Sequence, residues 1–350
     1  MVLIAWLNAT IIWIYGLKML LHIINRWEDP TKQASKYSEL VYVFAFSVIG
    51  YYIIILFDKE PMAPEYQLIY HIIMLVAFLA INVWLYLIQI RRERKRLAKY
   101  PELIDKDPDF TRNYTEFLKM LDDKYLSGKS DDIIKDLSRK ALHFVLLAVV
   151  IGVYELGLFL ERDLATIGLT PLAFRNLLYI IAAMFFVMMF TTSDLLRITN
   201  FEFEPLWARK WYFKSLEHRT ESWTVISSVP FLLTLLLFLF APLQVLFCAA
   251  AVSCIADSVA SVVGKNYGKR KMTNFGRFPT KSFEGLLAGT LSAFLSVMAV
   301  FIFYPVEGLL PLHIYAIALL CAFAFVYIDA FSTKLDRKST RLNSSHRIRY

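Results

Sequence analysis

The chain has 350 residues, of which 57% are hydrophobic, and its mean hydropathy is +0.50. Several apolar runs reach about 20 residues, the length that crosses the hydrocarbon core of a bilayer, so a water-soluble globular protein is excluded. The formal net charge of +8 invites comparison with nucleic-acid-binding proteins, but much of it comes from the last fifteen residues, and we expect no nucleic-acid partner.

Residues 336–350, DRKSTRLNSSHRIRY, carry five Lys or Arg and one Asp, so without them the formal charge falls from +8 to +4. The run DRKSTRLNSSH resembles the conceptual translation of a sequencing-adapter oligonucleotide. We therefore expect residues 336–350 to be an adapter artefact, and we exclude them from the interpretation of the fold as we would a fusion scar. The natural C-terminus is then expected to be missing.

The apolar runs predict an all-α polytopic membrane protein with about nine transmembrane helices. In chain order the predicted spans are 2–24, 37–57, 67–90, 141–160, 174–193, 224–240, 242–263, 283–304 and 312–333. Only Ala241 and Pro242 separate the sixth and seventh runs, which together are too long for one crossing. We expect a tight hairpin there.

The distribution of Lys and Arg predicts the orientation of the chain. The basic runs RRERKR, RKWYFK and GKRK follow the third, fifth and seventh predicted spans, so they share one side if every span crosses once. That side is predicted to be the cytoplasm, with the N-terminus outside. We expect an active site that faces the cytoplasm, in the plasma membrane of a prokaryote or the endoplasmic reticulum of a eukaryote.

The same pattern divides the chain into an N-terminal three-helix membrane region at 1–90, a basic cytoplasmic helical insert at 91–138 and a membrane core at 139–335. Apolar residues recur at helical spacing in the insert, which predicts a helix with one apolar face. They are Phe110, Tyr114, Phe117, Leu118, Leu121 and Tyr125. We expect this helix to lie against the membrane surface, where its basic residues suit anionic headgroups.

Asp257 lies inside the seventh predicted span, about two turns before its end. A charged side chain at the centre of a bilayer costs about 2.5–3.5 kcal/mol on insertion scales, so such a residue indicates a functional site. Small residues recur every four positions on this span and on the next one: Ala256, Ala260 and Gly264, then Gly285, Gly289 and Ala293. This spacing predicts two closely packed helices.

The segment between these two helices is rich in glycines and cations. It contains Gly264, Lys265, Gly268, Lys269, Arg270, Lys271, Arg277 and Lys281. Cations neutralise phosphate, and Thr280 or Ser282 can cap the next helix, whose N-terminus favours an anion. Because Mg²⁺ binds through one or two carboxylates together with substrate phosphates, Asp257 predicts a nucleotide-polyphosphate site at the membrane surface.

Further ionisable groups are predicted on the same side of the membrane. Arg139, Lys140 and His143 begin the fourth span, with Arg139 and His143 on one helical face. Asp194 and Arg197 end the fifth span. Glu217, His218, Arg219 and Glu221 precede the sixth. Together these clusters supply acid, base and cations where a lipid headgroup and a nucleotide can meet.

The run within 255–289, ADSVASVVGKNYGKRKMTNFGRFPTKSFEGLLAG, resembles the membrane lipid-alcohol kinases: dolichol (polyprenol) kinase, phytol kinase and CTP-dependent diacylglycerol kinase. The shared pattern is met by Asp257, Ala260, Gly264, Gly268, Lys281, Ser282, Glu284 and Gly285. RKALH at 139–143 and SDLLR at 193–197 are similar to two further motifs of that family. The resemblance covers about 139–335.

The resemblance implies transfer of the γ-phosphoryl group of CTP to the hydroxyl of a membrane lipid, with dolichol or polyprenol as the best guess. It implies that Asp257 binds Mg²⁺, that Glu284 completes the metal or loop geometry, and that Asp194 or His143 orients or deprotonates the alcohol. Lys281 would act on the phosphates. The implied binding residues are Arg139, Lys140, Gly264, Lys265, Gly268, Lys269, Arg270, Ser282 and Gly285.

Three alternatives stay open from the sequence. A phosphatidate-type cytidylyltransferase shares the K-[ST]-x-E-G pattern and CTP, although an HGG-x-x-DR-like signature is absent here. A membrane transporter would use Asp257 as an ion site, and a scaffold would use no chemistry. Asp329 represents an acidic position found in some members of the kinase family, near the point where the suspected adapter begins. The sequence does not predict an oligomeric state.

Overall fold

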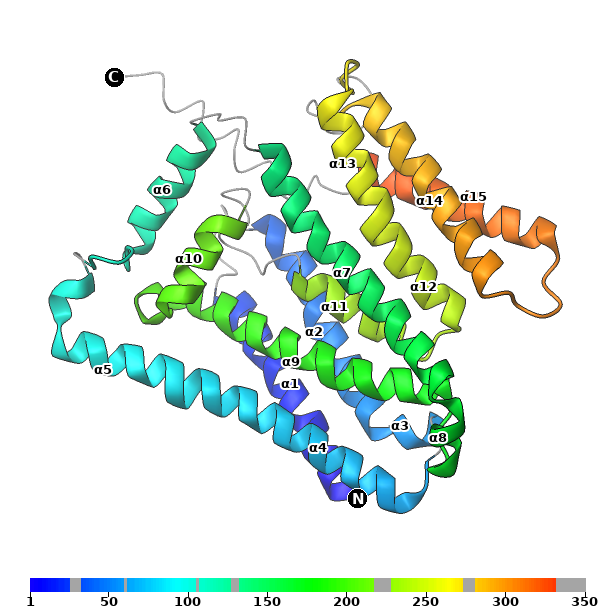
Figure 1. Ribbon diagram of the computed structural model, residues 1–350. Coiled ribbons are helices and arrows are strands. Elements are labelled where there is room, and N and C mark those ends of the chain that lie inside the picture. The colour runs from blue at the N-terminus through cyan, green and yellow to red at the C-terminus, as the bar shows by residue number, and fades with distance from the viewer. Residues whose placement is uncertain are drawn as a thin grey trace. The chain divides into compact units, whose positions relative to one another are not determined.

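The computed structural model describes residues 1–25, 33–59, 62–104, 107–126, 132–216, 228–272 and 281–331, and these residues form helices and their connections without a β-sheet (Figure 1). The chain divides into two compact units. Unit 1 comprises Met1–Gly128 with Gly157–Leu237, and unit 2 comprises Lys129–Leu156 with Phe238–Tyr350. The boundaries of these units differ from the predicted division at residues 91 and 139, which stays a prediction.

The helices of unit 1 follow the first three, the fifth and the sixth predicted spans and the insert. They are α1 (Val2–Asn25), α2 (Gln33–Ile54), α3 (Leu56–Lys59), α4 (Pro64–Asn82), the π-helix η2 (Val83–Ile90), α5 (Arg91–Lys99), η3 (Pro101–Ile104), α6 (Tyr114–Leu126), α8 (Glu161–Thr166), α9 (Pro171–Thr199), η4 (Phe201–Phe203), α10 (Leu206–Ser215) and α11 (Ser228–Leu237). Unit 2 holds most of α7 (Asp132–Phe159), followed by α12 (Leu243–Ala251), the π-helix η6 (Val252–Ala256), α13 (Asp257–Asn266), α14 (Phe283–Phe303) and α15 (Pro311–Phe331).

Every predicted span contains a helix, but the count of nine transmembrane helices is not confirmed. Six helices of the described residues are long and apolar enough to cross a membrane: Val2–Asn25, Pro64–Lys99, Pro171–Thr199, Leu243–Asn266, Phe283–Phe303 and Pro311–Ala330. Shorter apolar helices occur at Glu39–Ile54 and Phe144–Phe159. The chain is therefore an integral membrane protein with an all-helical described fold. α11 has ten residues, and α12 is a separate helix that begins at Leu243, with Pro242 as its N-cap.

The core of unit 1 joins α1, α4 and α9 through one buried tyrosine. Tyr15 of α1 donates a hydrogen bond to Asn82 Oδ1 at 2.7 Å, and its hydroxyl lies 3.1 Å from Thr192 Oγ1 of α9. Tyr70 of α4 donates to the main-chain oxygen of Leu177 at 2.8 Å. Because buried polar groups are costly when unpaired, these bonds fix how the three helices pack.

The predicted insert begins as a continuation of the third span, because α4, η2 and α5 form one helical segment (Figure 1). The apolar face of α6 packs within unit 1, and the expected position of this helix against the membrane surface stays a prediction. The ring of Phe117 is fully buried and lies 4.8 Å from that of Phe201, and the ring of Phe110 lies 5.6 Å from that of Phe213. The side chain of Tyr125 lies outside the described residues.

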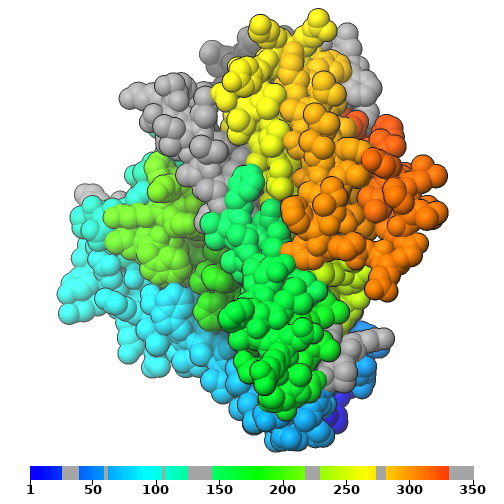
Figure 2. Space-filling view, turned by 45° about the vertical axis from the view of Figure 1, so that its right-hand side comes forward, coloured from blue at the N-terminus to red at the C-terminus, as the bar shows by residue number. Residues whose placement is uncertain are grey.

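Unit 2 is built from α14 packed against both α13 and α15. Figure 2 shows α13 and α14, in yellow and orange, side by side on the surface of this unit. At the other end of α14, Tyr304 donates a hydrogen bond to Glu155 of α7, and its ring contacts Phe247 of α12 at 4.8 Å. Large apolar side chains such as Leu287, 71% exposed, cover the outer face of α14, as expected for a surface in lipid.

Candidate active site

Asp257 occupies the junction between two kinds of helix. It is the first residue of α13 and follows the π-helical turn η6 inside the single span Leu243–Asn266. A π-helical turn inside an α-helix is frequent at functional sites, because the widened turn shifts the following side chains around the helix axis. The side chain of Asp257 is exposed, whereas its neighbour Ser258 is buried and donates to Cys254 O at 2.6 Å.

The predicted close packing of α13 and α14 is confirmed. A Cβ atom added to Gly285 would lie 2.6 Å from Ala260 O and 2.9 Å from Gly264 Cα, distances that real Cβ atoms do not adopt. A Cβ atom on Gly289 would lie 2.7 Å from the Cβ atom of Ala260. The small residues therefore let the two backbones touch, as in other small-residue helix pairs of membranes.

Ser282 is buried at the point where the two helices meet. Its Oγ accepts a hydrogen bond from Gly285 N at 3.2 Å, so Ser282 is the N-cap of α14, as predicted. A Cβ atom on Gly268 would lie 2.7 Å from Ser282 Cβ. Gly268 is therefore needed for the approach of its own backbone to Ser282, a packing role that the sequence analysis did not predict.

Glu284 holds the end of the glycine-rich turn. Its carboxylate accepts the main-chain N–H of Arg270 at 3.1 and 3.3 Å. Beside it, Met272 N donates to Lys281 O at 2.9 Å and Phe283 N donates to Arg270 O at 3.0 Å. The two ends of the loop between α13 and α14 are thus joined by main-chain bonds and by one carboxylate.

Lys281 contacts the last helix of unit 2. Its Nζ donates to the main-chain oxygen of Asp329 at 2.8 Å and forms an ion pair with the Asp329 carboxylate. Met272, Leu286 and Ala330 form a small buried cluster beside this pair. The structure thereby brings Asp329 of α15 to the site, which spacing in the sequence alone does not show.

The remaining cations of the turn are exposed. They are Lys265, Lys269, Arg270 and Lys271, and they lie on the same short segment that follows Asp257 on α13. Among the described residues no group of three or more His, Cys, Asp or Glu side chains is placed to hold a metal ion. The arrangement supplies one exposed carboxylate and several cations beside a backbone that Ser282 and Glu284 fix.

Several other predicted site residues are placed only in part. Arg139, Lys140 and His143 lie in α7, but their side chains are outside the described residues. Arg277 and Thr280 are also outside the described residues, as are the four residues Glu217, His218, Arg219 and Glu221 that precede the sixth predicted span. Their roles stay predictions.

The comparison with known families decides the class of protein. Residues 137–339, more than half of the chain, match the cytidylyltransferase family. The chain belongs to this family. Comparison with the curated proteins and with the solved structures finds no match. The members of this family are enzymes. Membership supports a membrane transferase whose substrates are a lipid and a nucleotide, in particular CTP. It favours this class over the transporter or the scaffold that the sequence left open.

The part of the cytidylyltransferase-family match that lies in unit 1 carries Asp194. Its side chain is fully buried and accepts a hydrogen bond from Arg197 Nη2 at 3.0 Å. The guanidinium of Arg197 also lies 4.7 Å from the centre of the Tyr212 ring. Asp194 is thus held in a buried ion pair, and its predicted action on the alcohol stays a prediction.

A buried ionic network that the sequence analysis missed surrounds this pair. Asp107 Oδ2 accepts bonds from Arg112 Nε at 2.6 Å and from Arg209 Nη2 at 3.1 Å, with all three side chains fully buried. Arg112 Nη2 also pairs with Glu93 at 2.8 Å. Burial opposes ionisation of Asp107, but bonds from the main chain of Asp109 and from the two arginines hold its pKa below its usual value.

Glu204 completes this network next to Asp194. It accepts a hydrogen bond from Ser193 through Oε1, while its fully buried Oε2 has no hydrogen-bond partner within the described residues. Complete burial raises the pKa of Glu204 to about 8. The motif FEFEP was the available signal, because it places a carboxylate among aromatic residues directly after a span. The sequence analysis made no prediction for this segment.

Proposed function

We propose that the chain is a CTP-dependent lipid-alcohol kinase, which transfers the γ-phosphoryl group to the hydroxyl of a membrane lipid, best guess dolichol or polyprenol. One observation carries the proposal. The K-S-x-E-G residues join the glycine-rich turn to α14 and α15 through hydrogen bonds, and the exposed cations of this turn follow the exposed Asp257 along the chain. Membership of the cytidylyltransferase family supports the use of CTP.

The residues suit phosphoryl transfer, which depends mainly on positioning and on neutralising charge. Lys265, Lys269 and Arg270 would bind the phosphates, and the bond from Arg270 N to Glu284 would hold their segment still. The lipid oxygen would attack the γ-phosphorus while the bond to CDP breaks, and we assign the hydroxyl proton to His143. The exposed Asp257 suits a Mg²⁺ ion, which needs one or two carboxylates besides phosphate oxygens and would neutralise phosphate charge.

A second candidate is a CDP-lipid synthase, which the description of the matched family favours. In that reaction a lipid phosphate oxygen attacks the α-phosphorus of CTP and pyrophosphate leaves. Both reactions need the same binding of a triphosphate, so the contacts of Glu284, Ser282 and Lys281 do not separate them.

Two labels distinguish the reactions. The purified full chain would be incubated with Mg²⁺, with dolichol, phytol, diacylglycerol or phosphatidate in turn, and with CTP labelled at the α- or the γ-phosphate. We expect γ-label to enter the lipid fraction with an alcohol, and no α-label to do so. Entry of α-label with phosphatidate would instead establish the CDP-lipid synthase, and neither label in any lipid would contradict both candidates.

The role of Asp257 is tested by substitution. We expect Asp257→Asn to reduce lipid labelling by at least about 10³-fold, because the neutral amide keeps the shape but loses the charge that binds the metal. Membrane insertion and the unfolding temperature should stay unchanged, since the side chain is exposed. Asp163→Asn, at an exposed position of α8, is the matched control and should keep full activity. Activity retained in Asp257→Asn would refute the metal role.

A further inference from the structure

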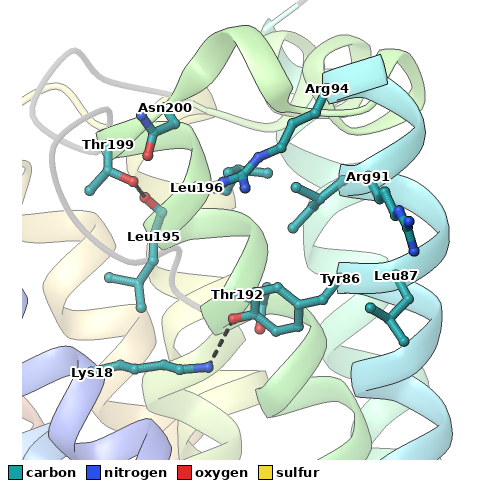
Figure 3. Close-up of a pocket in the computed structure, with 11 residues that line it drawn as sticks. Lys18, Tyr86, Leu87, Arg91, Arg94, Thr192, Leu195, Leu196, Thr199 and Asn200 are labelled. Carbon is teal, nitrogen blue, oxygen red and sulfur yellow. Dashed lines mark hydrogen bonds between the residues drawn. The ribbon is translucent and has the colours of Figure 1, made fainter. Parts of the chain in front are cut away.

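Unit 1 contains a cavity of about 560 Å³ that the proposed chemistry does not use. α1, the segment η2–α5 and the end of α9 form its walls (Figure 3). α1 and η2–α5 precede the region matched by the family, which begins at residue 137. The function of the first 136 residues is therefore not explained by the family match, and these residues build this cavity together with the end of α9.

The cavity is lined by three cations and by no carboxylate. Among the described residues, Lys18, Arg91 and Arg94 form no ion pair with a carboxylate. Lys18 Nζ donates to the Tyr86 hydroxyl at 3.0 Å, and the guanidinium of Arg94 lies 4.9 Å from the centre of the Phe203 ring. Glu93, the acid inside this basic run, pairs with Arg112 instead. The charge of the cavity therefore favours an anion, and the two guanidiniums suit phosphate oxygens.

One side of the cavity is apolar. Leu87, Ile90, Leu195 and Leu196 line it, and Leu87 is 57% exposed. The neighbouring Ile88 is 52% exposed, so an apolar surface continues from the cavity along the outside of η2. Thr199 and Asn200 at the end of α9 add hydrogen-bonding groups at the polar side. A ligand that fills these walls is amphiphilic, with a negative charge at one end.

The position of the cavity along the helices agrees with the depth of a lipid headgroup. The lining of η2 begins at Tyr86, 22 residues after the start of the span at Pro64, and that of α9 begins at Thr192, 21 residues after Pro171. At 1.5 Å per residue both distances are about 30 Å, the thickness of the hydrocarbon core. The cavity thus begins at the edge of the hydrocarbon core, and Arg91 and Arg94 follow on its polar side, while the π-helical geometry of η2 marks the same wall.

We propose that this cavity binds the phosphate of an anionic membrane lipid, with Lys18, Arg91 and Arg94 around the phosphate and the lipid chains along the exposed face of η2. A soluble anion such as inorganic phosphate or a nucleotide would use the same cations but would leave the apolar wall uncovered. The site goes beyond the proposed transfer reaction, because it belongs to unit 1 and to residues that mostly precede the family match.

Native mass spectrometry of the full chain in neutral detergent tests this proposal without nucleotide. Short-chain phosphatidic acid is the probe, and diacylglycerol with the same chains is the probe without phosphate. We expect phosphatidic acid to bind and diacylglycerol not to occupy this site. The double variant Arg91→Gln/Arg94→Gln should bind phosphatidic acid at least about 10-fold more weakly, as expected when charge-assisted hydrogen bonds are removed.

The neighbouring residues of the same basic run provide the control. Arg92→Gln/Lys95→Gln removes the same charge from α5 at positions that do not line the cavity, and its affinity should stay within about 2-fold of the parent. Equal weakening in both double variants would show general attraction to a basic surface and would overturn the proposal. Because the assay needs no turnover, its failure leaves the kinase proposal standing.

Two further measurements complete the test. Inorganic phosphate and CTP are added as competitors. If either one displaces phosphatidic acid with an affinity equal to that of the lipid, the cavity is a site for soluble anions, and the lipid assignment is contradicted. The unfolding temperature shows whether the arginine variant folds. If it does not, Lys18→Gln tests the same cavity from α1, and full retention of binding in this variant would overturn the proposal.

Discussion

Glu204 shows how one buried residue sets the charge of a whole network. Asp107, Glu93 and Asp194 supply three negative charges, and their arginine partners supply three positive charges. The six charges balance when Glu204 is neutral, which agrees with its pKa of about 8. A buried group that remains charged without a partner is strongly destabilising, so the neutral form is the one that the fold favours.

The pKa of Glu204 predicts how stability depends on pH. The ordinary value of 4.5 is raised to about 8 by burial, so the folded protein holds a proton that the unfolded chain releases. The contribution of the Glu204 proton to the free energy of unfolding is fully present below about pH 4.5. It is lost as the pH rises towards 8, and the free energy of unfolding then falls by up to about 1.4 kcal/mol per pH unit. Asp107, whose pKa is lowered from 3.8, changes stability only at lower pH.

Thermal unfolding between pH 5 and 9 checks this prediction with Glu204→Gln. The amide can still accept the hydrogen bond from Ser193, but it does not titrate. We expect the parent protein to lose stability relative to Glu204→Gln as the pH rises through this window. A stability difference between the two proteins that does not change with pH would show that Glu204 is ionised in the folded state.

At the scale of the element, the contact of α13 with α14 depends on the absence of side-chain atoms at Gly285. A methyl group there would press on Ala260 O and Gly264 Cα, which are main-chain atoms and cannot move aside alone. We expect Gly285→Ala to destabilise the protein by about 1–3 kcal/mol, the usual cost of overpacking. Transfer activity should fall as well, because Ser282 and Glu284 hold the turn that we propose binds phosphate at this contact.

Gly152 of α7 provides the control for this substitution. A Cβ atom added at Gly152 meets nothing within 4 Å, so Gly152→Ala should be neutral or stabilising by up to about 1 kcal/mol through helix propensity. Chemical unfolding in mixed micelles measures both variants. Equal stability of Gly285→Ala and the parent protein would mean that α13 and α14 are not in close contact.

The elements also show what the sequence could predict. Apolar run length located a helix at every predicted span, and four-residue spacing of small residues predicted the α13–α14 contact, because both signals are local. The π-helical turns at Val83–Ile90 and Val252–Ala256 have no comparable local signal. The same holds for the network of Asp107 and Arg209, which joins residues about 100 positions apart.

At the scale of the whole molecule, the open question is how often the chain crosses the membrane. Two exposed positions answer it, Lys99 at the end of α5 and Glu307 between α14 and α15. α11 has ten residues, about 15 Å of helix, and does not cross a bilayer without its neighbouring residues. If the segment 224–240 crosses, five spans separate the two positions, which then lie on opposite sides; if it does not, four spans separate them.

We expect the two positions to lie on opposite sides. With only four spans between them, the basic turn GKRK would face away from RRERKR, against the preference of Lys and Arg for one side. Single-cysteine variants Lys99→Cys and Glu307→Cys would be labelled in sealed, right-side-out vesicles with a membrane-impermeant maleimide. Cys248, Cys254 and Cys321 would first be replaced by alanine, and this background protein should remain unlabelled. Labelling of Glu307→Cys alone supports a crossing by the segment 224–240 with a cytoplasmic insert, whereas labelling of both variants or of neither refutes this arrangement.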